Sequence, residues 1–147
     1  MPEKATINRA RKKARQGKSA STQAGEFVRE EIHHIREGKH GARSAKQAIA
    51  IGLSKARRAG VKLPPPEKGS ASEETREQAA RDLSKGKSPR KKISAKRSRA
   101  MSRVLKREGS SAASNTALSR HARSAAAKRS TVARSRSAKK AARTRKK

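Results

Sequence analysis

The chain has no cysteine, tryptophan or tyrosine, and Phe27 is its one aromatic residue. Without cysteine there are no disulfide bonds and no thiolate metal ligands. The scarcity of aromatic side chains excludes base stacking as a way to bind single-stranded nucleic acid. No apolar run approaches the roughly 20 residues that span a bilayer, and residues 1–16 lack the apolar segment of a signal peptide. We therefore expect a cytoplasmic protein with no membrane partner.

Acidic residues are also scarce. Eleven Asp and Glu face 42 Lys and Arg, and the formal net charge is +31 over 147 residues. Residues 1–86 carry 20 Lys and Arg and 10 acids, whereas residues 87–147 carry 22 Lys and Arg and the single acid Glu108. The first region has the mixed charge of a folded surface, and the second has that of a nucleic-acid-binding tail. A charge of this size predicts a polyphosphate partner.

Residues 22–37 have the hydrophobic spacing of a helix. Steps of four, four and three residues place their main apolar side chains on one face. These side chains are Ala24, Val28, Ile32 and Ile35, and Phe27 widens the face. We expect Ser21 or Thr22 to cap the start of this helix and Gly38 to end it.

Residues 44–60 form the clearest predicted element. Ser44 stands three residues before a glutamine, which is the spacing of a capping box. Gly52 interrupts a stripe of small apolar residues, and a mid-helix glycine indicates close approach by the preceding helix. Gly60 supplies a left-handed C′ residue, after which Val61 is placed to fold back in a Schellman-type stop.

The remaining segments have weaker patterns. We expect a charged helix in 3–16 that is frayed in isolation and orders on a phosphate backbone. We also expect a short polar helix in 73–85, weak helices in 90–108 and 115–129, and a low-complexity end in 130–147. The predicted fold class is all-α, a small helical hairpin with long, largely disordered or weakly helical basic arms. Its segments are a basic N-terminal arm (1–20), the helical hairpin (21–63), a Pro/Ser linker (64–72), a short polar helix (73–86) and a basic low-complexity C-terminal region (87–147).

Histidines and glutamates raise the question of metal binding and catalysis. His33 and His34 are adjacent, so on a helix they point about 100° apart; neither they nor His40 has a cysteine to assist. We expect Glu30 and Glu31 to lie on a solvated polar face of the helix and to form local ion pairs. A chain with so little core has little to shape a pocket. We predict no enzyme, no catalytic residue, no metal, no cofactor and no small-molecule substrate.

Phosphate contact remains as the mode of binding, and it gives affinity without sequence preference. The turn at Ser88–Lys92 either lies along a minor groove or caps a helix. The predicted nucleic-acid-binding residues are Lys55, Arg57, Arg58, Arg90, Lys91, Lys92, Lys96, Arg97, Arg99, Arg103, Arg134, Arg136, Lys139, Lys140, Arg143 and Arg145.

Residues 25–66, GEFVREEIHHIREGKHGARSAKQAIAIGLSKARRAGVKLPPP, resemble a family of small, very basic bacterial proteins of unknown function. Its hallmark is a KQAIAIGLSKARRAG-type segment after a helix that ends in a basic-Glu-Gly step. Members are often labelled DNA-binding, histone-like or plasmid-stabilisation proteins. The resemblance implies a bacterial source and a nucleoid role, and it offers no catalytic residues to carry over.

The sequence thus predicts a non-sequence-specific DNA-binding, histone-like protein of the nucleoid that neutralises and compacts DNA through Lys/Arg–phosphate contacts. One alternative is an RNA- or ribosome-associated basic protein. Another is a helical module of the plasmid-maintenance type, in which the apolar face of residues 24–56 docks a protein and the tail tethers it to nucleic acid. Self-association stays open. Deletion of residues 87–147 is the test that separates the tail-centred hypothesis from the docking module.

Overall fold

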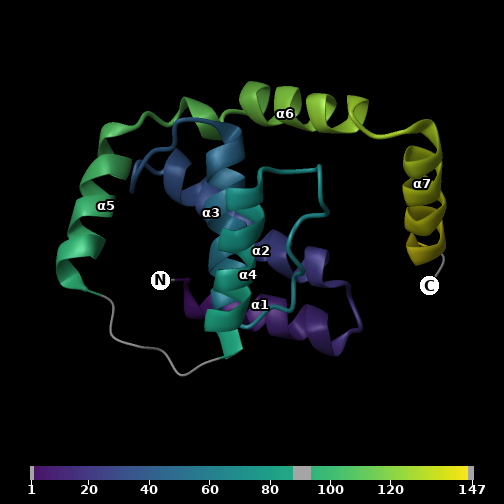
Figure 1. The fold of residues 1–147 in the computed structure, drawn as a ribbon, viewed down its shortest axis with the longest axis horizontal. Helices are drawn as coiled ribbons and strands as arrows, with labels where there is room; N and C mark the ends of the chain where they lie inside the picture. Colours follow the sequence, from purple (N-terminus) through teal and green to yellow (C-terminus); the bar gives the residue numbers. More distant parts are fainter. Residues whose placement is uncertain (1, 88–93, 146–147) are drawn as a thin grey trace.

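The computed structural model describes residues 2–87 and 94–145 (Figure 1), which contain seven α-helices, one short 3-10 helix and no strand. The elements are α1 (Lys4–Arg15), α2 (Ala20–Arg36), α3 (Ala45–Arg58), α4 (Glu73–Lys87), α5 (Ala95–Arg107), η1 (Ser111–Ala113), α6 (Asn115–Ala127) and α7 (Thr131–Arg145). None of these helices combines the length and apolar composition that a membrane crossing requires. The all-α prediction is confirmed.

Helices α2 and α3 form the predicted hairpin, and they approach closely at Gly52. A Cβ built on Gly52 would lie 2.7 Å from the Cα of Val28 on α2. Real side chains do not tolerate such a contact with a backbone atom, so the glycine permits the packing of the two helices. This confirms the prediction of a close approach at this position.

The ends of the two helices follow local signals. The Oγ of Ser44 accepts the backbone N–H of Gln47 at 3.2 Å, as predicted. At the other end of α3, the N–H of Val61 reaches the carbonyl of Ala56 at 3.1 Å, and Gly60 has a φ of +96°. These features are those of a Schellman stop, as predicted.

The start of α2 differs from the prediction. The N-cap residue is Ser19, whose Oγ accepts the N–H of Thr22 at 3.4 Å. The expectation that Ser21 or Thr22 caps the helix is therefore wrong. The apolar spacing places the helix, but it does not distinguish among the neighbouring hydroxyl residues that precede it.

A first apolar cluster fastens α1 to the hairpin. It contains Phe27 and Ala24 from α2, Ala56 from α3, Val61 after α3, and Ala10 from α1. The expectation of a frayed N-terminal helix is wrong, because a narrow stripe of small residues on α1 suffices to pack against α2. Thr6, one turn before Ala10, is fully buried on the same face.

A second apolar cluster joins the hairpin to the C-terminal part of the chain. Ile32 and Ile35 of α2 pack with Ala42 and Ala48, and with Ala112 and Ala113 of η1. Backbone hydrogen bonds reinforce the joint, since the N–H of Gly41 donates to the carbonyl of Leu105 at 2.8 Å. The segment around η1 is therefore part of the core, although the charge pattern groups it with the basic tail.

Helix α4 packs against α3, where Ala79 and Asp82 are buried. Side-chain hydrogen bonds tie the intervening proline segment to the helices. The Nε of Arg57 donates to the carbonyl of Leu63 and its Nη2 to the carbonyl of Pro64, each at 3.1 Å. Together, α1–α4 form the helical core of the molecule (Figure 1).

The prediction of long, largely disordered arms is wrong. Residues 94–145 are mostly helical, and α5, α6 and α7 extend around the core (Figure 1). Ser94, Ser114 and Ser130 each accept a backbone N–H of the following helix. Alanine, lysine and arginine have high helix propensity, which favours helix even where little apolar surface is buried.

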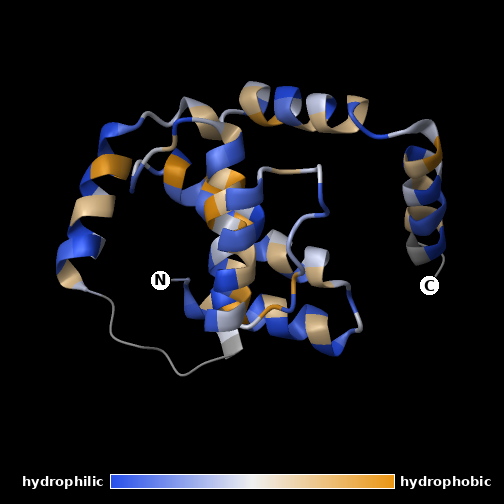
Figure 2. Ribbon diagram, viewed as in Figure 1, coloured by the Kyte–Doolittle hydropathy of each residue, from blue (hydrophilic) through white to orange (hydrophobic). Residues whose placement is uncertain are grey.

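The boundaries of these helices correct the sequence-based segments. Helix α6 agrees with the weak helix predicted for 115–129, whereas the helix predicted for 90–108 begins only at Ala95. The Ser88–Lys92 turn lies outside the described residues. The low-complexity end is helical in α7, along which hydrophilic residues alternate with moderately hydrophobic ones (Figure 2).

Candidate nucleic-acid interface

The core uses its acidic residues to hold its own cations. Glu26 is buried on α2, where it accepts hydrogen bonds from the Nζ of Lys13 and, at 2.8 Å, from the Nε of Arg9. The hydrogen bond from Lys13, helped by that from Arg9, lowers the pKa of Glu26 below its ordinary value of 4.5. Two cations of α1 are therefore committed to α2.

Glu30 and Glu31 are also buried, so the prediction that they form a solvated polar face is wrong. The Nζ of Lys55 donates to Oε2 of Glu31, and the Nε2 of His40 lies 3.3 Å from its Oε1. The backbone N–H of Glu3 donates to Oε1 of Glu30 at 3.1 Å. Their partners come from α3, from the loop after α2 and from the start of α1, which cover this side of α2.

The three predicted nucleic-acid-binding residues of α3 hold the fold together. Lys55 is the partner of Glu31. Arg57 is only 6% exposed, two of its donors are taken by backbone carbonyls, and burial lowers the pKa of its guanidinium. Arg58 places its Nε 3.5 Å from Oδ1 of Asp82 and donates from Nη2 to the Oγ of Ser54 at 2.7 Å. In this arrangement Lys55 and Arg57 are largely occupied by internal partners, whereas Arg58 remains about half exposed beside its partners.

Helix α5 presents the opposite situation. Lys96, Arg97, Arg99 and Arg103 are exposed, and none of them forms an ion pair within the part of the chain that the structure describes. Steps of three and four residues place Lys96, Arg99 and Arg103 on one face. These predicted residues are therefore gathered on one helix as a row of cations open to solvent.

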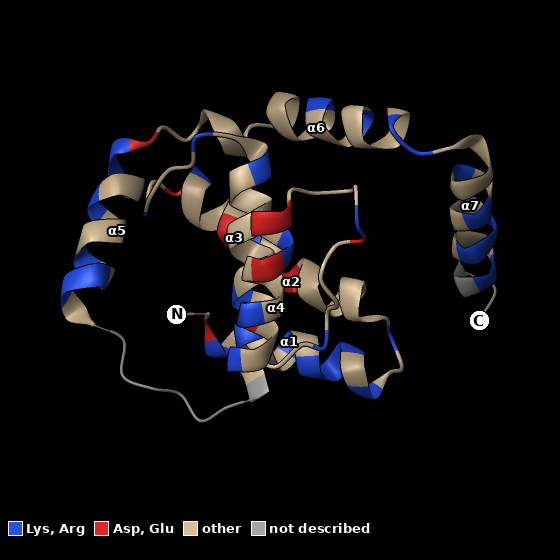
Figure 3. Ribbon diagram, in the orientation of Figure 1, with Lys and Arg blue, Asp and Glu red and all other residues tan. Residues whose placement is uncertain are grey.

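Helix α7 carries a second set of cations. Exposed on it are Arg134, Arg136, Lys139, Lys140 and Arg143, while Arg145 is its last residue. Lys and Arg are distributed along α5 and α7, which lie on opposite sides of the molecule (Figure 3). Asp and Glu lie mainly in α1–α4. The structure thus separates the predicted residues into two surfaces. Arg90, Lys91 and Lys92 lie outside the described residues.

The structure adds six exposed cations of the described acid-poor region that the sequence analysis did not select. Lys106 and Arg107 lie at the end of α5, Arg120 and Arg123 lie on α6, which connects the two sets, and Lys128 and Arg129 follow α6. The signal for them was present, because they belong to the same acid-poor region. The one acid of that region, Glu108, has its Oε1 3.6 Å from the Nε of Arg43 in the α2–α3 loop.

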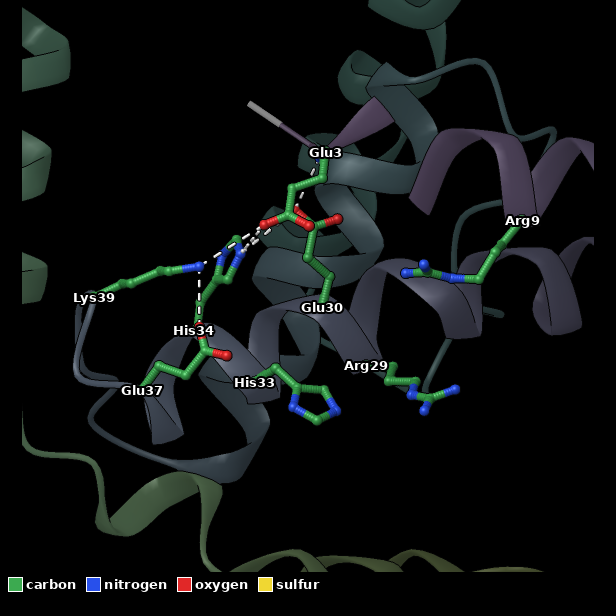
Figure 4. Close-up of a pocket in the computed structure, with 8 residues that line it drawn as sticks. All are labelled: Glu3, Arg9, Arg29, Glu30, His33, His34, Glu37 and Lys39. Atoms are coloured by element: carbon green, nitrogen blue, oxygen red, sulfur yellow. Dashed lines mark hydrogen bonds and ion pairs between the residues drawn. The ribbon is translucent and has the colours of Figure 1, made fainter. Parts of the chain in front are cut away.

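A small open cavity of about 340 Å³ lies elsewhere, between α1 and the end of α2 (Figure 4). The Nε2 of His34 is 3.0 Å from Oε1 of Glu3, and the hydrogen bond between them lowers the pKa of Glu3. Lys39 lies 3.0 Å from Glu37, which raises the pKa of Lys39 and lowers that of Glu37. This lining of paired charges suits a small ion better than an apolar ligand.

Comparison with known proteins places a family of unknown function, DUF6496, on residues 12–68. The matched region contains the α2–α3 hairpin and the proline segment, and it ends before α4. No curated protein and no solved structure matches the chain. The family match therefore concerns the core and does not extend to the cationic helices α5–α7.

Proposed function

We propose that this protein binds double-stranded DNA without sequence preference, and that it neutralises and compacts DNA in the bacterial nucleoid. The contacts run from the Lys and Arg side chains of α5, α6 and α7 to backbone phosphates. Binding of this kind depends on charge density and on the accessibility of the cations.

The observation that carries this proposal is the row of unpaired, exposed cations on α5. Lysine and arginine side chains that fold stability required would have acidic or carbonyl partners, as Lys55 and Arg57 do in the core. Lys96, Arg99 and Arg103 have no such acidic partner among the described residues. An external polyanion supplies the partner that the chain itself lacks.

The side-chain composition of α5–α7 supports binding without sequence preference. Among these side chains are many Ala and Ser and no Phe, Tyr or Trp, so stacking on such rings is excluded and the contacts left to Lys and Arg are mainly with phosphates. Phosphate contacts fix position without reading sequence. Because α5 and α7 lie on opposite sides of the molecule (Figure 3), one chain can contact two duplex segments, which favours compaction.

The burial of the hairpin's apolar face weighs against the docking-module alternative. Its proposed contact surface is the apolar face of residues 24–56, but Ala24, Ile35 and Ala48 on that face are fully buried. Helix α1 and η1 already cover it. Nothing in the structure favours RNA over DNA in particular, so the RNA alternative is decided by the experiment below.

The test is a titration of a labelled duplex with the full chain between about 50 and 200 mM salt. We expect the logarithm of the binding constant to fall linearly with the logarithm of salt concentration, with a slope of about −0.9 for each neutralised phosphate. Duplexes of unrelated sequence should give the same line. An affinity that hardly changes with salt, or that differs strongly between sequences, would contradict the proposal.

A competition separates DNA from RNA. The full chain is bound to labelled duplex DNA and challenged with unlabelled duplex DNA or with structured RNA of equal phosphate number. We expect DNA to displace the label at least as well as RNA does. Displacement by RNA at much lower concentration would transfer the function to the RNA-associated alternative.

A further inference from the structure

Apart from the cationic helices, one cluster of side chains in the core has the chemistry of a metal site. Glu31, His34 and His40 place one potential ligand atom each within 4.8 Å of one another. Glu31 and His34 are three residues apart on α2 and so share a face of the helix. The loop between α2 and α3 brings His40 to the same place, and the rings of His34 and His40 meet edge to face with centroids 6.2 Å apart.

The divergence of His33 and His34 agrees with the helical geometry expected from the sequence. Adjacent His33 and His34 diverge, and the ring of His33 points away from His34 (Figure 4). The partner of His34 is instead His40, six residues later. Glu31, which the charge pattern assigns to the surface, is fully buried beside them.

Glu31 has an oxygen without a hydrogen-bond donor. Its Oε2 accepts from Lys55, but its Oε1 is buried and accepts no hydrogen bond, with the Nε2 of His40 at 3.3 Å. Buried carboxylate oxygens in folded proteins nearly always have a partner. Glu30 has a similar unpartnered oxygen, Oε2, on the same helix. A cation bound between Glu31 and the two imidazoles would supply a partner to Oε1.

We propose that Glu31, His34 and His40 bind a divalent transition-metal ion of the Zn²⁺ class. Two imidazole nitrogens and one carboxylate oxygen form a donor set that Zn²⁺ accepts, with the fourth position left for water or another carboxylate. Imidazole ligands disfavour Mg²⁺ and Ca²⁺, which prefer oxygen.

Neighbouring carboxylates support the ligand set. Glu3 and Glu30 lie 3.0 Å and 3.9 Å from the Nε2 of His34. Carboxylates in contact with a ligand histidine orient its ring and raise its basicity. The Glu3 side chain is half exposed, whereas Glu31 is fully buried with an oxygen that accepts no hydrogen bond, which favours the group that contains Glu31 and His40.

The ion would link two parts of the core. His40 directly precedes Gly41, whose N–H holds the carbonyl of Leu105 at the end of α5. Binding would fix this loop against α2, and a ligand that binds only the folded chain raises its melting temperature. This effect requires no nucleic acid, so the proposal stands or falls independently of DNA binding.

The test uses the full chain, freed of metal with a chelator and titrated calorimetrically with ZnCl₂. We expect one ion per chain, and at least about tenfold weaker binding in His34→Gln and His40→Gln. His33→Gln is the matched control, because His33 is adjacent in sequence and exposed, and it should bind as the parent does. Far-UV circular dichroism checks that each variant keeps its helices.

A second readout avoids variants altogether. Co²⁺ added to the metal-free parent chain should give visible absorption bands of nitrogen and oxygen ligation, and Zn²⁺ should abolish them. The proposal is overturned if the parent shows neither saturable Zn²⁺ binding nor such bands. It is equally overturned if His33→Gln weakens binding as much as His40→Gln does, since that result indicates adventitious surface binding.

Discussion

In the core, Glu26 lies against Arg9 and Lys13, and Glu31 lies against Lys55 and His40. On α5, the same kinds of cation have no acidic partner within the described residues. The two regions contain similar numbers of Lys and Arg, 20 in residues 1–86 and 22 in residues 87–147. What separates the two regions is ten acids against one, because the acids of the core hold part of its cations in internal ion pairs, whereas helix α5 has no such acid beside it.

The comparison also moves the boundary between the regions. Ala112 and Ala113 belong to the tail by charge, but they are buried against α2 and α3. Deletion of residues 87–147 would therefore expose the core as well as remove cations, and it cannot isolate the function of the tail. Substitutions on α5, or a shorter deletion of residues 129–147, leave the η1 contacts in place.

The largest expected effect is on core packing. Ile35 is fully buried, so Ile35→Ala should lower the free energy of unfolding by about 2–5 kcal/mol. Val132 on α7 is 65% exposed, and Val132→Ala should change it by less than about 0.5 kcal/mol. Chemical denaturation followed by circular dichroism measures both. Equal losses of unfolding free energy in the two variants would contradict this difference, because they would show that α7 is packed as tightly as the core.

Gly52→Ala should separate α2 from α3, because its Cβ would fall 2.7 Å from the Cα of Val28. We expect a loss of about 1–3 kcal/mol in unfolding free energy. The control is Gly25→Ala, also in a helix, where a Cβ meets nothing within 4 Å. There the helix propensity of alanine should stabilise the chain by about 0.5–1 kcal/mol. A neutral Gly52→Ala would contradict the close packing.

Glu26→Gln tests the internal ion pairs. The pKa of Glu26 is lower in the folded chain than its ordinary value of 4.5, so the charged carboxylate stabilises the fold above pH 4.5. This contribution is lost as the pH falls through the folded-state pKa. At neutral pH we expect a loss of about 1–3 kcal/mol, which shrinks toward acid pH. Denaturation midpoints over this range measure it. Glu74→Gln, on the exposed side of α4, is the control with little expected change.

The smallest effect is expected at a helix cap of the basic region. Ser114→Ala removes the acceptor for the N–H of Ala117 and should destabilise α6 locally by about 1 kcal/mol. Faster hydrogen exchange of the α6 amides, with unchanged exchange in α2, would show it. Ser119→Ala, which removes no cap, is the matched change. Loss of protection throughout the core would mean that α6 is integral to the fold.

Much of the hairpin was predictable from sequence. The apolar repeats of α2 and α3, the Ser44 cap and the Schellman stop at Gly60 are local signals, and each depends on residues a few positions apart. The close approach at Gly52 was also readable, because a mid-helix glycine is costly without a reason. The N-cap of α2 at Ser19 was missed because several hydroxyl residues stand together.

The burial of Glu30 and Glu31 was not predictable in the same way. In the sequence of α2 alone, Glu30 and Glu31 have the pattern of a polar helix face. Their partners are groups of Glu3, His40 and Lys55, which are far apart in the sequence. The same reason explains why the internal partners of the three α3 cations were not predicted. Disorder in the basic region was predicted from its small content of apolar residues. A small apolar content limits how tightly the helices pack, but it does not prevent helices from forming.

The central claim is that the cations of α5 contact DNA and that those of the core do not. The most direct measurement compares two full-length variants that each lose four charges. One is Lys96→Gln, Arg97→Gln, Arg99→Gln and Arg103→Gln together. The other replaces by Gln four exposed core lysines, Lys18, Lys46, Lys62 and Lys68.

Both variants are titrated with the same duplex over the same salt series. The account predicts that the α5 variant binds at least about tenfold more weakly and that its salt slope becomes shallower by about 0.9 for each lost contact. The core variant should stay close to the parent in affinity and slope. Equal weakening in the two variants would contradict the account, because it would mean that DNA responds to total exposed charge and not to the position of the cations on the acid-poor helix α5.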